Sequence, residues 1–465
     1  MSFITDESRW SDVWIAAAAR GTTICGDFLA ATALALALQG AGAGGLAVSG
    51  LLLAATLPLV VLAPLAGRLA DRTDSRTLLV TIGFGQAAIC ALLAVVEQPI
   101  LVVGLVALLA CGLAVTQPCL AALLPAMVRP ADLPRASAIS QTAVSLGALG
   151  GPVLAGLLVG QFGTRVPLLL DAVTYLALVV AGLLLRTRRG GRRPAASSEV
   201  AASSEVAARQ ATAANGPAVS GGVATPGGTE VGWRLRRDPL MLVMVVSTAV
   251  VIAAIGGINV IEVFFIRETL QGSATTYGLV SAAWMAGMLP GTWLAVRVAR
   301  RLGDDGALVR GVLATLAVCS LMVLLAATVP AAGVLVPLWL VGGAANGGEN
   351  VFANLLTARR VPEAMRARAY ASYGAAVQGG SMAGFLIGGA LLAVVPPRPL
   401  IAGAGVVGLL VVLAFVPFVT AAARRASSAG LATPSRPAEP EPAAGDTVGP
   451  WLSASHARGS GTSSS

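Results

Sequence analysis

Long apolar runs alternate with short polar connections along most of the chain. Each run is close to the ~20 residues that a helix needs to cross the hydrocarbon layer of a membrane. The runs span residues 13–38, 46–67, 77–96, 99–120, 136–160, 166–186, 239–266, 276–296, 308–328, 331–357, 369–394 and 399–421. The pattern predicts an all-α membrane protein with twelve transmembrane helices.

Two polar segments interrupt this pattern and divide the chain. Residues 187–238 are rich in Ala, Ser, Gly and Arg, and residues 422–465 are rich in Pro, Ser, Gly and Ala. Neither has enough apolar surface to form a core, so we expect a disordered linker and a disordered tail. The predicted domains are therefore a short N-terminus (1–12), a six-helix half (13–186), the linker, a second half (239–421) and the tail.

The two halves match each other at a constant offset of 232 residues. The matches include Leu57-Pro58 with Leu289-Pro290, Leu123-Leu124 with Leu355-Leu356, Pro130 with Pro362, Gly147 with Gly379, and Gly156 with Gly388. Gly and Leu are common here, so a single match means little, but five landmarks at one offset indicate a duplicated six-helix unit. We expect two pseudo-symmetric halves with a substrate site where they meet, near the membrane midplane.

The composition and the charge of the connections fix the expected setting. The chain is 56% hydrophobic and 11% charged, with a net charge of +9. Soluble domains carry about 25% charged residues. One set of short connections holds Arg68, Arg72, Arg76, Arg129, Arg135, Arg297, Arg300, Arg301, Arg310, Arg359, Arg360, Arg366 and Arg368. The other set holds only Arg165, Arg267 and Arg398. The positive-inside rule then places both termini in the cytoplasm and the protein in the plasma membrane, and the basic charge needs no nucleic-acid partner.

Several kinds of chemistry lack the residues they need. The chain has no lysine, its single histidine, His456, lies in the polar tail, and all five cysteines lie in apolar runs. A P-loop lysine, a Schiff-base lysine and a histidine-based triad or metal site are therefore missing. We therefore expect no enzyme, no cofactor and no metal site.

The expected partners are a small molecule, protons and the lipid bilayer, and the expected oligomeric state is a monomer.

A carboxylate inside a membrane span is costly, so each one is a candidate functional residue. Asp27 lies near the middle of the first span, with Arg20 two helical turns before it. The repeat pairs Asp27 with Asn259 in the seventh span, and we expect the two to face each other across a central cavity. An alternative is that Asp27 only pairs with Arg20, although two turns separate them by about 10 Å.

The tenth span carries a second group of polar residues. Asn346, Glu349 and Asn350 share one helical face, and the repeat pairs Glu349 with Gln117. Glu349 is predicted to be functional, whereas the asparagines fit either a site or hydrogen bonds between helices.

Two further carboxylates lie nearer to the ends of their spans. For Asp171, pairing at an extracellular gate and solvation at the membrane interface both remain open, with Arg165 close in sequence. For Glu262, close to Arg267, interface solvation is favoured.

The connection between the second and third runs carries a recognisable motif. It reads Gly67-Arg-Leu-Ala-Asp71-Arg72-Thr-Asp-Ser-Arg76. It resembles the loop 2–3 signature of the major facilitator superfamily, Gly-x-x-x-Asp-Arg-x-Gly-Arg-Arg, with matches at Gly67, Asp71, Arg72 and Arg76. The resemblance implies that this loop helps to switch the conformation of the protein.

The fifth span carries a second motif, Gly147-Ala-Leu-Gly-Gly151-Pro152-Val-Leu-Ala-Gly156. It resembles the antiporter motif of the same superfamily, Gly-x-x-x-Gly-Pro-x-x-Gly-Gly, with Ala155 in place of one glycine. Small residues at this spacing also let two helices pack closely. The pair Gly26-Asp27 after Arg20 resembles the first span of the multidrug and siderophore exporters.

These features together predict a secondary active transporter that works by alternating access. The leading interpretation is proton-coupled export of small hydrophobic or amphipathic molecules, such as drugs, secondary metabolites or siderophores. One alternative is a proton-coupled importer of a small metabolite, and another is a non-transporting membrane receptor or lipid scramblase. The arginine that drug–proton antiporters of the superfamily carry in the fourth span is missing from residues 101–120, so coupling would depend on Asp27, Glu349 or Asp171.

Overall fold

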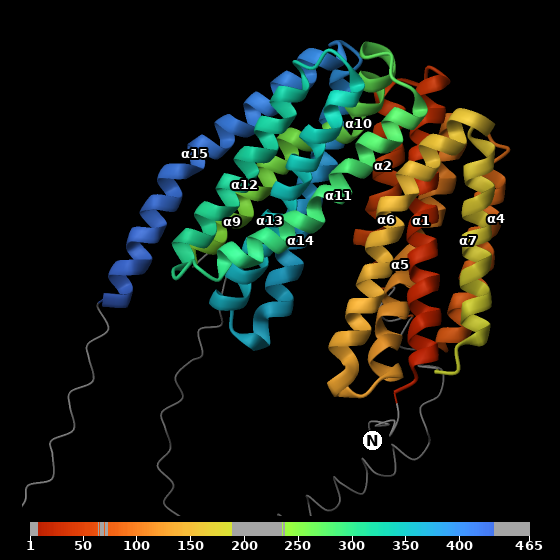
Figure 1. The fold of residues 1–465 in the computed structure, drawn as a ribbon, viewed down its shortest axis with the longest axis horizontal. Helices are drawn as coiled ribbons and strands as arrows, with labels where there is room; N and C mark the ends of the chain where they lie inside the picture. The colour runs from red at the N-terminus through yellow and green to blue at the C-terminus, as the bar shows by residue number, and fades with distance from the viewer. Residues whose placement is uncertain are drawn as a thin grey trace, which may run out of the picture. The chain divides into compact units, whose positions relative to one another are not determined.

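A computed structural model describes residues 8–63, 65, 69, 73–187, 235 and 238–431. The first half contains helices α1 (Trp10–Gly40), α2 (Gly44–Val61), α4 (Ser75–Leu93), α5 (Pro99–Met127), α6 (Leu133–Phe162) and α7 (Arg165–Leu184) (Figure 1). The second half contains α9 (Pro239–Gly256), α10 (Ile258–Phe264), α11 (Ala274–Ala299), α12 (Asp305–Ala326), α13 (Leu335–Arg360), α14 (Glu363–Leu391) and α15 (Pro397–Leu431). A π-helical turn, Phe265–Thr269, continues α10, and 3-10 turns at Pro130–Asp132 and Ala332–Val334 precede α6 and α13.

Each predicted run has a helical counterpart, with α9, α10 and the π-turn together forming the seventh span. The all-helical membrane fold with twelve spans is therefore confirmed. Ten of these segments are long and apolar enough by themselves to cross a membrane. The other two, α13 and α14, have the length but carry the polar residues that make their sequences less hydrophobic.

Several helix ends differ from the expected limits. Helix α14 begins at Glu363, although the apolar run begins at 369, because its arginine-bearing first turns are helical as well. Helix α15 continues to Leu431, past the expected end at 421. Most of the predicted linker lies outside the described residues, as does the tail after 431.

Short polar residues start several helices, as their capping chemistry predicts. Asp238 accepts a hydrogen bond from the Met241 amide, with Pro239 as the first helical residue of α9. Asp74 caps α4 in the same way through the Thr77 amide. These side chains satisfy backbone donors that would otherwise lie unpaired at the membrane edge.

The Asp238 cap also joins three helices. Arg360 at the end of α13 donates to Asp238 at 2.8 Å and to Asp305 at the start of α12 at 3.1 Å. The side chains of Asp238 and Arg360 are 8% and 24% exposed, so solvent screens this network only in part. The network therefore joins the start of α9, the start of α12 and the end of α13.

Ser8, just before α1, is hydrogen-bonded to the connection between α5 and α6. Ser8 donates a 2.5 Å hydrogen bond to Asp132, and Arg129 lies 3.3 Å from the same carboxylate. The Ser8 hydrogen bond, assisted by Arg129, holds the pKa of Asp132 below its ordinary value. Its contribution to stability is therefore present above the ordinary pKa and lost as the pH falls through the lowered one.

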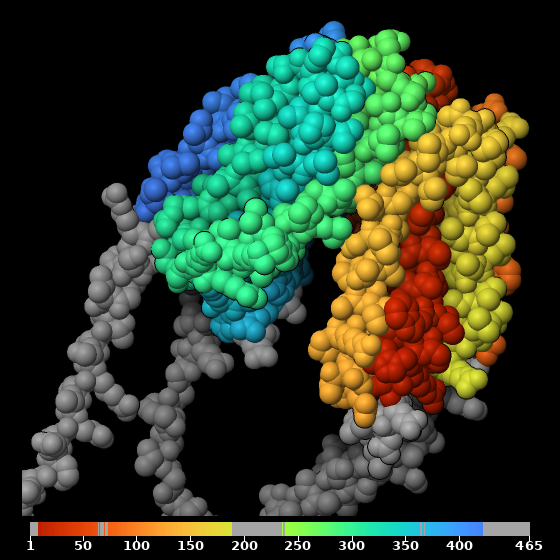
Figure 2. All heavy atoms as spheres, viewed as in Figure 1, coloured from red at the N-terminus to blue at the C-terminus, as the bar shows by residue number. Residues whose placement is uncertain are grey.

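Helices within each half pack through long apolar interfaces. In the first half, α1 packs on α6 and α7, α4 packs on α7, and α2 packs on α5. Figure 2 shows this arrangement from one face, with α1 in red between α6 in orange and α7 in yellow. In the second half, α13 packs on α11 and α12, and α9 packs on α14.

Contacts between the halves lie at the end of the helices away from the N-terminus. Gln39 donates to Glu268 at 3.1 Å, and Ser49 donates to the Phe385 carbonyl at 2.5 Å. Thr275 of α11 donates to the Gly156 carbonyl of α6 at 3.2 Å. The two halves are therefore closed against each other at this end.

Candidate functional site

Asp27 is held inside the first half by a tyrosine of a neighbouring helix. The Tyr175 hydroxyl of α7 donates a 2.5 Å hydrogen bond to Oδ1 of Asp27 on α1. Tyr175 is fully buried, and Asp27 is half-buried. A half-buried carboxylate thus lies between two membrane-spanning helices with a neutral donor as its partner.

A second carboxylate lies next to this pair. Asp171 is one turn before Tyr175 on α7 and is fully buried. The Cys90 thiol of α4 donates to Asp171 at 3.2 Å, and Thr174 donates to it at 3.1 Å. A side chain at Gly26 would collide with the Asp171 carboxylate, so that carboxylate lies directly against α1, beside Asp27. We call Asp27, Asp171, Tyr175, Cys90 and Thr174 the α1–α7 cluster.

No arginine neutralises this cluster. Arg20 donates instead to Ser140 of α6 at 3.4 Å, and its Nε is buried without a partner. Within the described residues, no arginine nitrogen lies within 4 Å of the carboxylate of Asp27 or Asp171. Direct pairing between Arg20 and Asp27, the alternative considered for this span, is therefore not found. Two buried carboxylates without a cation are costly as charges, and proton binding removes that cost.

Pairing of Asp171 with Arg165, one of the two possibilities left open for this residue, is not found in the structure. Arg165, the nearby arginine, forms an exposed pair with Glu97 at 3.3 Å. Asp171 instead accepts hydrogen bonds from Cys90 and Thr174, and because it is fully buried, solvation at the membrane interface is also wrong. The sequence showed a carboxylate near a helix end, but not that α7 turns it toward α1.

Glu349 forms the corresponding arrangement in the second half. It is 2% exposed on α13 and accepts a 2.5 Å hydrogen bond from the Tyr373 hydroxyl of α14. Each half therefore contains a carboxylate and a tyrosine bonded across two helices. A functional role for Glu349 stays a prediction, and this buried hydrogen bond is the geometry on which it can be tested.

The predicted amides make fewer contacts across helices. Asn350 donates to the Asn346 carbonyl at 2.9 Å, and Asn259 donates to the Gly256 carbonyl at 3.1 Å, each within its own segment. Gln117 is half-buried on α5. Asp27 bonds Tyr175 rather than Asn259, so the structure provides no hydrogen bond for the expected pair across the cavity.

Glu262 is a candidate that the sequence interpretation set aside. It is 8% exposed on α10, and its Oε1 is buried without a hydrogen-bond partner. Trp339 of α13 and Tyr277 of α11 lie beside it, whereas Arg267 donates to the Gly272 carbonyl at 2.8 Å. Interface solvation is therefore wrong for Glu262. In the sequence, the apolar residues on both sides of Glu262 indicate burial, whereas the nearby Arg267 indicates a helix end.

The glycine motif of α6 connects the α1–α7 cluster to the other half. Gly147 and Gly151 lie against the α1 backbone at Gly21 and Cys25, where a side chain would collide. Gly156 lies against Ala274 and Gly278 of α11, with a Cβ at Gly156 only 2.7 Å from the Ala274 carbonyl oxygen. Pro152 stands between these two contacts and also touches Gly278 through its carbonyl. One helix thus packs on the helix that carries Asp27 and on a helix of the second half.

The motif of the second connection is only partly described. Arg76 is half-buried in the first turn of α4. Gly67, Asp71 and Arg72 lie outside the described residues.

The described residues were also searched for clusters of metal-ligating side chains. Among the described residues, no group of three or more His, Cys, Asp or Glu side chains could hold a metal ion. The structure therefore offers buried carboxylates as its titratable groups, and no assembled metal site in the described ranges.

Comparisons with known proteins agree with this fold. The family model "Major Facilitator Superfamily" matches residues 16–264 and 244–458. The chain belongs to the major facilitator superfamily and is a secondary transporter that works by alternating access, not an enzyme. Comparison with curated protein sequences gave no match.

Solved structures of three transporters illustrate the likeness. A peptide transporter POT in complex with sulfate has a TM-score of 0.65 and 13% identity, covering 89% of this chain and 95% of its own. A nucleoside transporter NupG has a TM-score of 0.67 and 14% identity, covering 88% and 99%. A bacterial homologue of the iron transporter ferroportin, in an inward-facing state, has a TM-score of 0.59 and 16% identity, covering 89% and 100%. At these identities the likeness shows the fold alone.

Proposed function

We propose that this protein exports small hydrophobic or amphipathic molecules in exchange for protons. The observation that carries the proposal is the α1–α7 cluster, in which a half-buried and a fully buried carboxylate lie together with no arginine partner among the described residues. A proton is the one ligand that neutralises such a site without needing additional space. Asp27 is the proposed coupling residue because it is half-buried, and so open to exchange, whereas Asp171 is fully buried.

Coupling requires that proton binding alters the contact between the halves. The packing of α6 supplies a route, because Gly147 and Gly151 touch α1 while Gly156 touches α11. A shift of α1 on protonation of Asp27 is passed to α6 and changes the contact at the closed end. Since the motif Gly147–Gly156 also resembles that of antiporters, it supports export rather than import.

The charge of the connections supports the orientation. Arg129, Arg300 and Arg359 lie at the helix ends near the chain termini, which the positive-inside rule places in the cytoplasm. The contacts between the halves then lie on the extracellular side, so this conformation is closed to the outside. The proposed location is the plasma membrane.

The cargo class is proposed from composition. Ala, Gly, Leu and Val dominate the helices, and few polar side chains could anchor a hydrophilic molecule. Drugs, secondary metabolites and siderophores all include molecules of this apolar or amphipathic kind.

Transport in proteoliposomes tests the proposal. Purified protein is reconstituted with a panel of fluorescent apolar cations and neutral dyes, and an imposed pH gradient drives dye movement. We expect uphill movement against the proton flow, and collapse of that movement when a protonophore is added. Co-directional movement of dye and protons identifies the importer instead, and movement unaffected by the protonophore contradicts proton coupling.

A further inference from the structure

An apolar groove lies on the second half, between the end of α11 and the beginning of α12. Its volume is about 520 Å³, within the ~300–1,000 Å³ of typical ligand sites. Val298 and Leu302 form one side, and Ala314 and Val318 form the other. The groove is open rather than enclosed.

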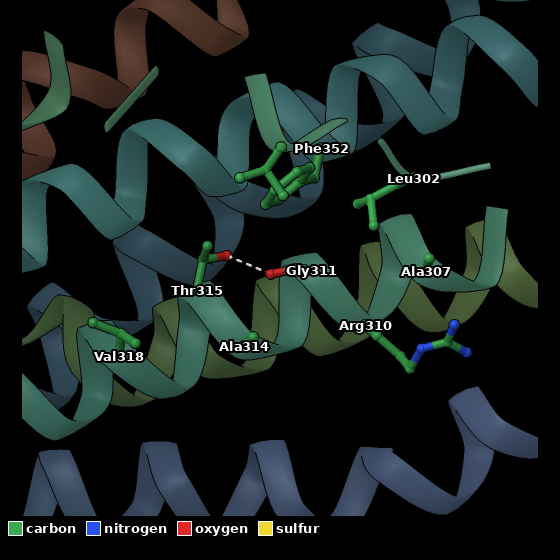
Figure 3. Close-up of a pocket in the computed structure, with 9 residues that line it drawn as sticks. Leu302, Ala307, Arg310, Gly311, Ala314, Thr315, Val318 and Phe352 are labelled. Carbon is green, nitrogen blue, oxygen red and sulfur yellow. Dashed lines mark hydrogen bonds between the residues drawn. The ribbon is translucent and has the colours of Figure 1, made fainter. Parts of the chain in front are cut away.

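The floor and the rim of the groove differ in chemistry. Phe352 of α13 forms the floor, directly across from Gly311, where an added Cβ would lie 3.0 Å from the ring. Figure 3 shows Phe352 facing Gly311 and Thr315, while the guanidinium of Arg310 extends away from the ring. The groove therefore has an apolar bed and a cationic end.

Arg310 is available to an incoming anion. Its side chain is 53% exposed, and its partner Asp304, at 3.5 Å, is 68% exposed. A pair this open to solvent contributes little, so an anionic group can displace or share it. Arg310 lies in the second turn of α12, at the end where the positive-inside rule places the cytoplasmic leaflet.

We propose that this groove binds an anionic phospholipid of the cytoplasmic leaflet. One acyl chain lies along Val298, Ala314 and Val318 over Phe352, and the phosphate contacts Arg310. Basic pockets between transmembrane helices on the cytoplasmic side favour such headgroups. The bilayer supplies this ligand directly, since both walls of the groove belong to membrane-spanning helices.

The groove lies on two helices that carry features of the proposed transport site. It touches α11, which carries the Gly278 contact to the first half, and α13, which carries Glu349 one turn before Phe352. A lipid here therefore contacts the helix that packs on the first half and the helix that carries Glu349.

Native mass spectrometry tests the proposal on the full chain. The protein is released from membranes that contain equal amounts of phosphatidylglycerol and phosphatidylcholine with identical acyl chains. We expect the wild type to retain phosphatidylglycerol preferentially. Arg310→Gln should lower that preference about fivefold, as expected for the loss of one surface arginine near a charged headgroup.

Two further variants separate the groove from general surface charge. Ala314→Phe fills the exposed groove and should remove retained lipid of either headgroup. Arg301→Gln removes an exposed arginine of the same membrane end that does not line the groove, and should behave as wild type. Equal retention of both lipids by the wild type, or equal effects of Arg310→Gln and Arg301→Gln, overturns the proposal. Full retention by Ala314→Phe places the lipid outside the groove and overturns it as well. Thermal unfolding confirms that the variants are folded.

Discussion

At the residue scale, each half of the protein holds a carboxylate that accepts a hydrogen bond from a tyrosine of a neighbouring helix, Asp27 from Tyr175 and Glu349 from Tyr373. Asp27 stands out because an apolar run surrounds it, whereas Tyr175 lies far along the chain and reaches Asp27 only through the packing of α7 on α1. For Asp171 and Glu262, the nearby Arg165 and Arg267 in the sequence indicate a position close to a helix end. Side-chain direction decided otherwise in both cases, and it depends on how each helix is rotated in the bundle.

The Tyr175 hydroxyl should matter for transport itself. Tyr175→Phe keeps the buried ring and removes the donor to Asp27. A hydrogen bond to a charged group contributes about 1.5–3 kcal/mol, so we expect gradient-driven transport to fall about tenfold while the protein stays folded. The matched control is Tyr370→Phe, because Tyr370 donates to the Asn354 carbonyl at an exposed position. Equal rates for the two variants would remove Tyr175 from the site.

The ionised form of Glu262 should destabilise the folded protein. Glu262→Gln keeps the volume and removes the charge next to an unpartnered oxygen. We expect the melting temperature in detergent to stay level or to rise by a few degrees, because a buried charge that has a tryptophan donor but no cation destabilises the fold. A fall of several degrees on this substitution would show that Glu262 is held by a strong interaction that we have not identified.

At the element scale, the apolar runs predicted the number and order of the spans because a bilayer demands about 20 apolar residues for each. Helix ends were harder, since α14 and α15 continue through polar residues that hydropathy does not count. The glycine motif of α6 was visible as a pattern, but its two contact surfaces were not. Only the fold shows that Gly147 faces α1 and Gly156 faces α11.

The contact between α6 and α11 should control which side of the transporter is closed. Gly156→Val places a branched side chain against Ala274 and Gly278, which the close approach cannot admit. We expect the closed end to open, so a cysteine introduced at Gln39 becomes more accessible to a thiol reagent from that side, in a version without native cysteines. Gly150→Ala is the control on the same helix, because its nearest neighbour is Cys25 at 3.8 Å. Unchanged labelling in Gly156→Val would argue against a gate here.

The network at the start of α9 should stabilise the second half. Arg360→Ala leaves Asp238 and Asp305 without their partner, which we expect to cost about 2 kcal/mol in the free energy of unfolding. The neighbouring Arg359→Ala removes only an exposed, 3.5 Å contact with the Leu302 carbonyl and should cost much less. Thermal unfolding of the two variants in the same detergent compares them directly.

At the scale of the whole molecule, the sequence repeat accounts for two halves of six spans each. The positions of the carboxylate–tyrosine pairs, in contrast, differ between the halves. The repeat at 232 residues places similar helices in both halves, yet the carboxylate–tyrosine pairs lie on different helices: α1 with α7 in the first half, and α13 with α14 in the second. A repeat in sequence could predict the first of these facts. It could not predict the second, because the offset relates Asp27 to Asn259 and Glu349 to Gln117 rather than to another carboxylate.

The orientation of the whole molecule is a separate prediction. Single cysteines at Ser197 and Ser435, in a version without native cysteines, should react with an impermeant reagent only after the membrane is permeabilised. The arginine distribution is the reason for this expectation. Labelling of either position in intact cells would reverse the assigned topology.

The most direct test of the central claim compares two kinds of transport in the Asp27→Asn variant. Asparagine keeps the shape and cannot carry a coupling proton, so we expect uphill export driven by a pH gradient to be lost while downhill substrate exchange continues. Glu97→Gln, which removes an exposed carboxylate, is the control and should retain both. If Asp27→Asn retains full gradient-driven transport while Glu349→Gln eliminates it, the coupling site lies in the second half and the α1–α7 cluster is structural.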